Sequence, residues 1–267
     1  MSDAPVDAPA VDSSVSVAAA ARSSRLGIAR SAGILGAGNI ASRALGLVRE
    51  MVIAAFFGSS PLANAFVVAS QVPTIIYDLL IGGLLSSALV PVFSDYASRD
   101  DDNVSLWALA SRVVTLAALL LSTLTLLVLL FAPQIAVIIT DYPPELQAAT
   151  AMLIRFVAPS IFFFGLSGVF TGLLYALKRF SFAAFAAAVY NFGIIIGATL
   201  LSRGFEGNAR IVGLALGIFL GSVVQLSLLL PDLRDVRLYP RLGAFWRDPG
   251  LRRIVRLYGP IALSVVV

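Results

Sequence analysis

Long apolar runs recur along most of the chain and are separated by short polar segments. A run of about 18 or more apolar residues is long enough to cross a bilayer core of ~30 Å as an α-helix. The runs are continuous and do not alternate every second residue, so they favour helices over the strands of a membrane barrel. The pattern predicts an all-α, polytopic helical membrane protein with six complete transmembrane helices and part of a seventh. The expected spans are residues 32–57, 62–93, 106–139, 147–176, 182–201, 210–230 and 259–267.

The segments outside these spans differ in composition. Residues 1–31 are rich in small and polar residues and have no long apolar block, so we expect a disordered cytoplasmic tail. Residues 32–230 would form one six-helix transmembrane lobe. Residues 259–267 would begin the seventh helix, and because the chain ends inside this apolar run we expect it to be truncated.

Residues 231–258 form a basic segment that we place in the cytoplasm. Near its end, apolar residues recur at helical spacing while three arginines fall between them; the apolar positions are Leu251, Ile254, Val255 and Tyr258. This spacing predicts an amphipathic helix lying in the membrane interface. A plain solvated linker is the alternative.

Composition supports the membrane assignment and explains the net charge. Hydrophobic residues make up 59% of the chain and charged residues only 13%, against about 25% charged in soluble domains. Basic residues outside the spans fall almost entirely on the side of the N-terminus, which predicts that the N-terminus is cytoplasmic. The charge of +4 therefore reflects topology and contact with anionic membrane lipids, not binding of nucleic acid.

The chain contains no cysteine and no histidine. Their absence excludes thiolate nucleophiles, imidazole bases and most zinc sites. No glycine-rich phosphate loop or nucleophile elbow is present. We therefore expect no enzyme activity, no metal site and no cofactor.

The first expected span carries a polar stripe. On a helix of about 100° per residue, Asn39, Arg43, Gly46 and Glu50 fall on one line, and Arg49 lies beside it. The opposite side of the helix is apolar. The charges of this span therefore share one face.

The second expected span repeats this arrangement with weaker polarity. Asn64, Gln71 and Asp78 are spaced by seven residues and share a face. The link between the two spans is short, so the two polar faces are expected to line one cavity.

Two interpretations account for the buried charges. In the first, Arg43 pairs with Glu50, and Arg49 or Asp78 completes a structural cluster. In the second, the arginines line a water-filled cavity, because an arginine at mid-membrane costs ~2.5–3.5 kcal/mol and commonly marks a transport path. The planar guanidinium suits phosphate, so this interpretation predicts an anionic, phosphate-bearing substrate.

The stretch SRALGLVREMVIAAFFGSSPLANAFVVASQVP, followed by LVPVFSDY, resembles the N-terminal signature of the MurJ/MviN family. YALKRFSFAAFAAAVYN and the segment ending in GPIALSVVV are also similar to that family. The family consists of lipid II flippases of peptidoglycan synthesis, within the multidrug/oligosaccharidyl-lipid/polysaccharide exporter superfamily. The likeness runs from about residue 30 to residue 267.

The resemblance implies a two-lobe transporter of the bacterial inner membrane, of which this chain would be the N-lobe. Such a transporter moves lipid II, the undecaprenyl-diphosphate-linked disaccharide-pentapeptide, to the outer leaflet by alternating access. Arg43 and Arg49 match the family's substrate-binding arginines, while Glu50 and Asp78 would modulate their charge. Asn39, Asn64 and Gln71 would line the cavity. Membrane potential or a coupling ion would drive the cycle.

The chain also departs from the pattern of many family members. It has Asn64 where they have Asp, Tyr77 where they have a further cavity arginine, and Gly82 where they have Glu. These differences leave two alternatives open: a flippase for another polyprenyl-linked glycan, and a non-transporting pseudoflippase that acts as a scaffold.

Overall fold

The computed structural model describes the backbone of residues 12–58, 60–78, 85–99, 103–239 and 248–266. Side chains are described for these residues except 12–28, 85–86 and 260–266. Residues 1–11 of the expected tail, Gly82, residues 240–247 of the basic segment and Val267 lie outside the described residues. Within the described ranges all regular structure is helical, in agreement with the all-α prediction.

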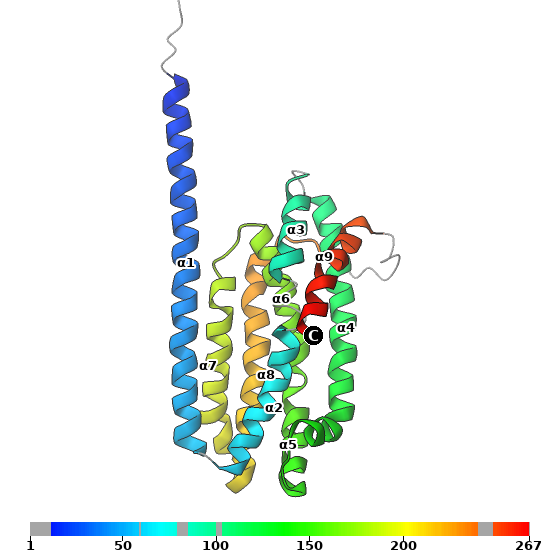
Figure 1. The fold of residues 1–267 in the computed structure, drawn as a ribbon. Helices are drawn as coiled ribbons and strands as arrows, with labels where there is room; N and C mark the ends of the chain where they lie inside the picture. The colour runs from blue at the N-terminus through cyan, green and yellow to red at the C-terminus, as the bar shows by residue number, and fades with distance from the viewer. Residues whose placement is uncertain (1–11, 59, 79–84, 100–102, 240–247, 267) are drawn as a thin grey trace, which may run out of the picture.

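Most helices pack side by side in a bundle, and α1 extends well beyond one end of it (Figure 1). Five short 3-10 or π segments flank the α-helices; of these, η3 (Ala183–Phe185), η4 (Leu201–Gly204) and η6 (Leu230–Leu233) connect to α7 and α8. The α-helices are α1 (Asp12–Phe57), α2 (Pro61–Tyr77), α3 (Val90–Ala97), α4 (Val104–Ile139), α5 (Pro144–Val157), α6 (Ser160–Ala176), α7 (Ala186–Thr199), α8 (Arg210–Leu229) and α9 (Pro249–Val266).

The six expected spans are only partly confirmed. Three helical stretches of the described chain are long and apolar enough to cross a membrane: 104–139, 183–204 and 207–233. The expected span 147–176 is a bent pair, α5 and α6, with an angle of 40° between them; counted as one, it makes a fourth. The break falls next to Pro159, which lacks the backbone N–H that would continue the helix.

The first two expected spans depart further from the prediction. The polar residues of α1 lower its hydropathy, and α1 is not among the helices that are apolar enough to cross a membrane. Within the expected span 62–93 the structure describes α2, which ends at Tyr77, and then the π segment η2 (Leu85–Leu89), which leads into α3 at Val90; residues 79–84 lie outside the described residues. Gly58, at a φ of 59°, ends α1 in a left-handed conformation that glycine adopts without strain.

Residues 12–31 of the expected tail belong to α1. This stretch contains four consecutive alanines, 18–21, and alanine has the highest intrinsic helix propensity. The composition that indicated a tail without an apolar core is therefore compatible with a helix that continues from the bundle.

The basic segment ends in α9, which joins two elements that we expected to be separate. The amphipathic pattern is present in part: Leu251 and Ile254 are buried and Arg252, Arg253 and Arg256 are exposed, but the expected apolar position Val255 is exposed as well. The helix continues through residues 259 and 260 to Val266 instead of ending there. Proline removes one backbone hydrogen bond and often kinks a helix without ending it.

Two carboxylates hold the start of α9 against the bundle. Buried Asp248 accepts the N–H groups of Gly250 at 2.8 Å and Leu251 at 3.0 Å, as an N-cap residue does, and pairs with Arg112 of α4. On α3, Asp95 accepts Arg253 at 2.6 Å and Arg99 at 2.9 Å. These two guanidinium groups hold the pKa of Asp95 below its ordinary value.

The helices α7 and α8 pack with their backbones in close contact. A Cβ atom added to Gly197 would lie 2.5 Å from Gly217 Cα and 2.8 Å from Gly213 O. Gly193 faces Gly221 in the same way. Small residues at such a seam let two helix backbones approach, which is how helices associate in lipid.

We expect Gly197→Ala to destabilise the protein by about 1–3 kcal/mol, because the added methyl group meets backbone atoms that have no room to move. The measurement is the thermal unfolding midpoint in detergent. Gly36→Ala is the matched control: it also lies inside a helix, but nothing is within 4 Å of its added Cβ. Gly36→Ala should leave the midpoint unchanged or raise it, so equal losses in both variants would contradict the close contact.

Candidate functional site

The polar residues of α1 lie on its surface as the helical spacing predicts. Asn39, Arg43 and Glu50 are exposed. Arg43 Nε donates to Asn39 Oδ1 at 3.4 Å, a contact between positions one helical turn apart. The other donors of the Arg43 guanidinium therefore remain available to a ligand.

Arg49 is held more firmly, although it comes from the same helix. Its Nη1 donates to Asn191 Oδ1 of α7 at 3.0 Å, and its Nη2 pairs with Glu50. The Arg49 side chain is 29% exposed and that of Glu50 is 62% exposed. The first of the two interpretations paired Arg43 with Glu50, but in the structure the Glu50 carboxylate contacts the adjacent Arg49.

Asn191 is the residue that joins these groups, and the sequence analysis did not identify it. Its side chain is buried at 7% exposure, and its Nδ2 donates to the Ser42 carbonyl of α1 at 3.2 Å. The small residue Gly46 lies opposite: a Cβ there would be 3.7 Å from Asn191 Nδ2. The available signal was a single amide inside the apolar run of 183–204.

The polar residues of α2 share a face but are separate from the α1 group. Asn64, Gln71 and Asp78 are all exposed, while Ala65 and Ala69 on the other side are buried. The helix α1 packs along α7, whereas α2 packs on α5, α6 and α8. Among the described residues, no hydrogen bond or ion pair joins these three side chains to Arg43 or Arg49.

An aromatic row connects α2 with the Arg49 region. The Tyr77 ring lies 5.6 Å from that of Phe164 on α6, and Phe164 lies 4.5 Å from Tyr190, the neighbour of Asn191. Tyr77 therefore makes an aromatic contact at the position where the family resemblance led us to expect an arginine.

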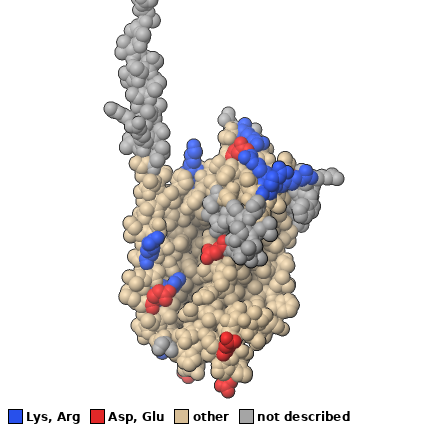
Figure 2. Space-filling model, viewed as in Figure 1, with Lys and Arg blue, Asp and Glu red and all other residues tan. Residues whose placement is uncertain are grey.

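On the face shown in Figure 2, few other charged groups lie at the same height as the charges of α1. Most of the visible Lys and Arg gather at the end of the bundle where α3 and α9 lie, as Figures 1 and 2 show together. Arg43, Arg49 and Glu50 carry a summed charge of +1, which favours an anionic ligand. Planar guanidinium donors suit the oxygens of phosphate. The described residues contain no group of three metal-ligating side chains.

Comparison with known proteins identifies relatives of this chain. A chain from Vibrio cholerae, described as a probable lipid II flippase MurJ, is 30% identical over 246 residues, covering 88% of this chain and 46% of the relative. A lipid II flippase MurJ from Burkholderia cenocepacia is 28% identical over 233 residues, covering 85% and 45%. The chain thus spans about half the length of the curated relatives it matches.

Solved structures show the same fold. The inward closed conformation of lipid II flippase MurJ aligns with a TM-score of 0.70 at 22% identity, covering 87% of this chain and 47% of that one. A MOP superfamily transporter from Pyrococcus furiosus, for which a reversed polarity of the binding pocket suggests a different function, aligns at 0.65 and 17% identity.

The family model described as lipid II flippase MurJ matches residues 53–267. This match covers most of the chain and begins just after the α1 charges. The chain is a helical membrane protein that belongs to the MurJ family of lipid II flippases.

Proposed function

We propose that this chain forms the N-terminal lobe of a flippase for lipid II, and that its two α1 arginines bind the diphosphate of that lipid. The observation that carries the proposal is the pair Arg43 and Arg49 on one face of a helix in an apolar bundle. The family match begins at residue 53, so the role of these arginines rests on their geometry and chemistry.

The two arginines would have different tasks. Asn191 and Glu50 fix the position of the Arg49 guanidinium before a ligand arrives, which lowers the entropy lost on binding. Among the described residues Arg43 has one long contact, with Asn39, which leaves its terminal nitrogens to turn toward a phosphate. Glu50 reduces the positive charge of the site, so that the ligand binds and still leaves.

The exposed α2 residues would form the other side of the cavity. Asn64 and Gln71 offer amide donors and acceptors to the uncharged sugar part of the substrate, while Asp78 adds negative charge near the end of α2. The cavity would alternate between the two leaflets as two lobes rock about it, driven by membrane potential or by a coupling ion.

We place the protein in the bacterial cytoplasmic membrane, with its N-terminus in the cytoplasm. The basic side chains gathered near α3 and α9 support this orientation, because cytoplasmic segments carry an excess of Lys and Arg (Figure 2). At the opposite end of α4, the charged residues are acidic: Asp141 lies in the connection from α4 to α5, and Glu145 lies in the first turn of α5.

Tyr77 favours one alternative, a flippase for a different polyprenyl-diphosphate-linked glycan. Its packing against Phe164 puts an aromatic contact where a third cation is expected, which would change recognition of the sugar and not of the diphosphate. Mass spectrometry of the lipids that co-purify with the full-length protein separates the two substrates. The retained Arg43 and Arg49 speak against a scaffold without transport activity.

We expect the double variant Arg43→Ala, Arg49→Ala of the full-length protein to lose complementation of a strain depleted of its own lipid II flippase. Removing charged partners should weaken lipid II binding about tenfold or more. The measurements are growth after depletion and lipid II binding by the purified protein.

The matched control for this experiment is Arg30→Ala. Arg30 is also an exposed arginine of α1, but it lies outside the polar stripe. It should support growth as the unchanged protein does. Growth of the double variant at normal expression would rule out the cationic site.

We expect Asn191→Leu to lower lipid II affinity about tenfold, because a hydrogen bond to a charged group contributes ~1.5–3 kcal/mol. Gln225→Leu is the control, since it removes another amide that is buried to the same extent, from α8. The Oε1 atom of Gln225 has no hydrogen-bond partner in the described part of the chain. If both variants bind lipid II equally well, Asn191 does not position Arg49.

A further inference from the structure

The segment after η6 crosses the end of the bundle with its side chains alternating between two directions. Val236 and Leu238 pack against the core, while Asp235, Arg237 and Tyr239 are exposed. Such alternation is typical of extended backbone. One face of the segment is thus apolar and anchored, and the other presents polar and aromatic groups.

Two sets of contacts fix this segment in place. Arg179 donates from both terminal nitrogens to the Asp235 carboxylate at 2.5 Å, and it also contacts the Asp232 carbonyl. This bidentate pair lowers the pKa of Asp235. At the other end, the Tyr239 N–H donates to Ser111 Oγ of α4 at 3.1 Å. The exposed side chains between these points therefore have a defined position.

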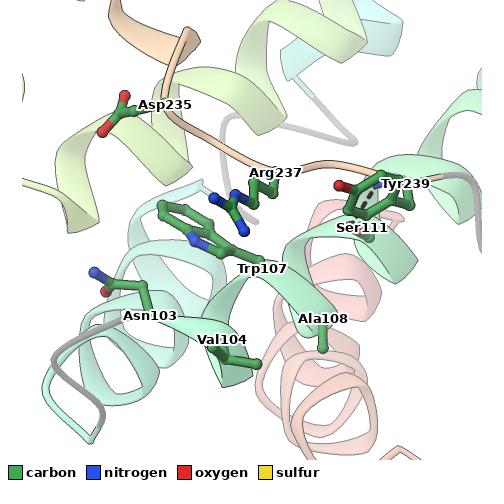
Figure 3. A pocket seen from close by; sticks show the side chains of 8 residues that line it. All are labelled: Asn103, Val104, Trp107, Ala108, Ser111, Asp235, Arg237 and Tyr239. Atoms are coloured by element: carbon green, nitrogen blue, oxygen red, sulfur yellow. Dashed lines mark hydrogen bonds between the residues drawn. The ribbon is translucent and has the colours of Figure 1, made fainter.

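A polar cavity of about 650 Å³ lies between this segment and the start of α4. Figure 3 shows the Arg237 side chain extending from the segment toward the indole of Trp107. The lining residues are Asn103, Val104, Trp107, Ala108, Ser111, Asp235, Arg237 and Tyr239.

An apolar cavity of about 500 Å³ continues from the polar one. The two share Ser111 and Tyr239, and the second follows α4 from Val114 to Ser122, with Phe162 and Phe170 of α6 on its wall. The polar cavity lies at the start of α4, and the apolar cavity lies further along the same apolar helix. Together they make a long site with a polar end and an apolar body.

The charge of the polar end is positive. The Asp235 carboxylate is compensated by Arg179, whereas Arg237 makes no hydrogen bond or ion pair with another described residue. Trp107 and Tyr239 are residue types that prefer the level of lipid headgroups, with an apolar ring and a polar edge. The site thus complements a molecule with an anionic head and a hydrocarbon tail.

We propose that these two cavities bind one anionic phospholipid from the surrounding bilayer, with its phosphate at Arg237 and an acyl chain along α4. The site is separate from the α1 arginines, because α4 and α1 lie on opposite sides of the bundle (Figure 1). It does not depend on the proposed lipid II activity. The bound lipid would attach the segment 235–239 to the membrane.

Quenching of Trp107 by brominated lipid tests the proposal. Trp246→Phe leaves Trp107 as the one tryptophan, since the chain contains two. The purified full-length protein, if necessary with its other tryptophans replaced, is titrated in micelles with brominated phosphatidylglycerol or brominated phosphatidylcholine. We expect half-maximal quenching by phosphatidylglycerol at a concentration at least about fivefold lower, from the one cationic contact.

Three variants distinguish the charge of Arg237 from general effects. Arg237→Gln should abolish the preference for phosphatidylglycerol, and Arg237→Lys should keep most of it. Arg234→Gln removes an exposed arginine outside the cavity and should change nothing. The proposal is overturned if Arg237→Gln keeps the preference, if Arg237→Lys loses it equally, or if Arg234→Gln has the same effect.

Two further measurements test the tail and the source of the phosphate. Ala118→Phe fills the apolar cavity and should raise the half-maximal concentration of phosphatidylglycerol severalfold; an unchanged value overturns the acyl-chain contact. Soluble glycerol 3-phosphate should not relieve the quenching. Relief at millimolar concentration would mean that the site binds a free phosphate ester and not a membrane lipid.

Discussion

The glycine contact between α7 and α8 fixes the position of α7, and α7 supplies the residue that contacts Arg49 of α1. Gly193 and Gly197 press α7 onto α8, and Asn191, two residues before Gly193, lies on the opposite side of α7, toward α1. In lipid, helices gain little from the hydrophobic effect, so packing of small residues must supply this attachment. With α7 fixed, its one buried amide holds both the α1 backbone and Arg49.

Local spacing was sufficient to predict some features of this arrangement. The polar stripe of α1 and the shared face of Asn64, Gln71 and Asp78 follow from the helical period, and the structure shows these residues where the period puts them. At the start of α9 the period predicted the buried positions of Leu251 and Ile254 but not the exposure of Val255. Side-chain pairing across the bundle did not follow. The sequence carries no sign that Glu50 contacts Arg49 and not Arg43, because that choice depends on the position of Asn191, far away in the chain.

The continuity of helices was also beyond prediction from apolar runs alone. Residues 147–176 read as one span but bend by 40° at Pro159, whereas residues 249–266 read as two elements but form one helix across Pro260. A proline removes one hydrogen bond in both places, and the surrounding contacts decide whether the helix axis changes direction. Asp248 and Asp95 supply such contacts at the start of α9.

The alternation in residues 235–239 places a constraint on how this part of the chain can change. Inserting a single residue after Asp235 would exchange the two faces, turning the apolar side chains outward and the Arg237 charge toward the core. An insertion of two residues would preserve the faces and only lengthen the path to Ser111. Natural variation in the length of this segment should therefore occur in even steps.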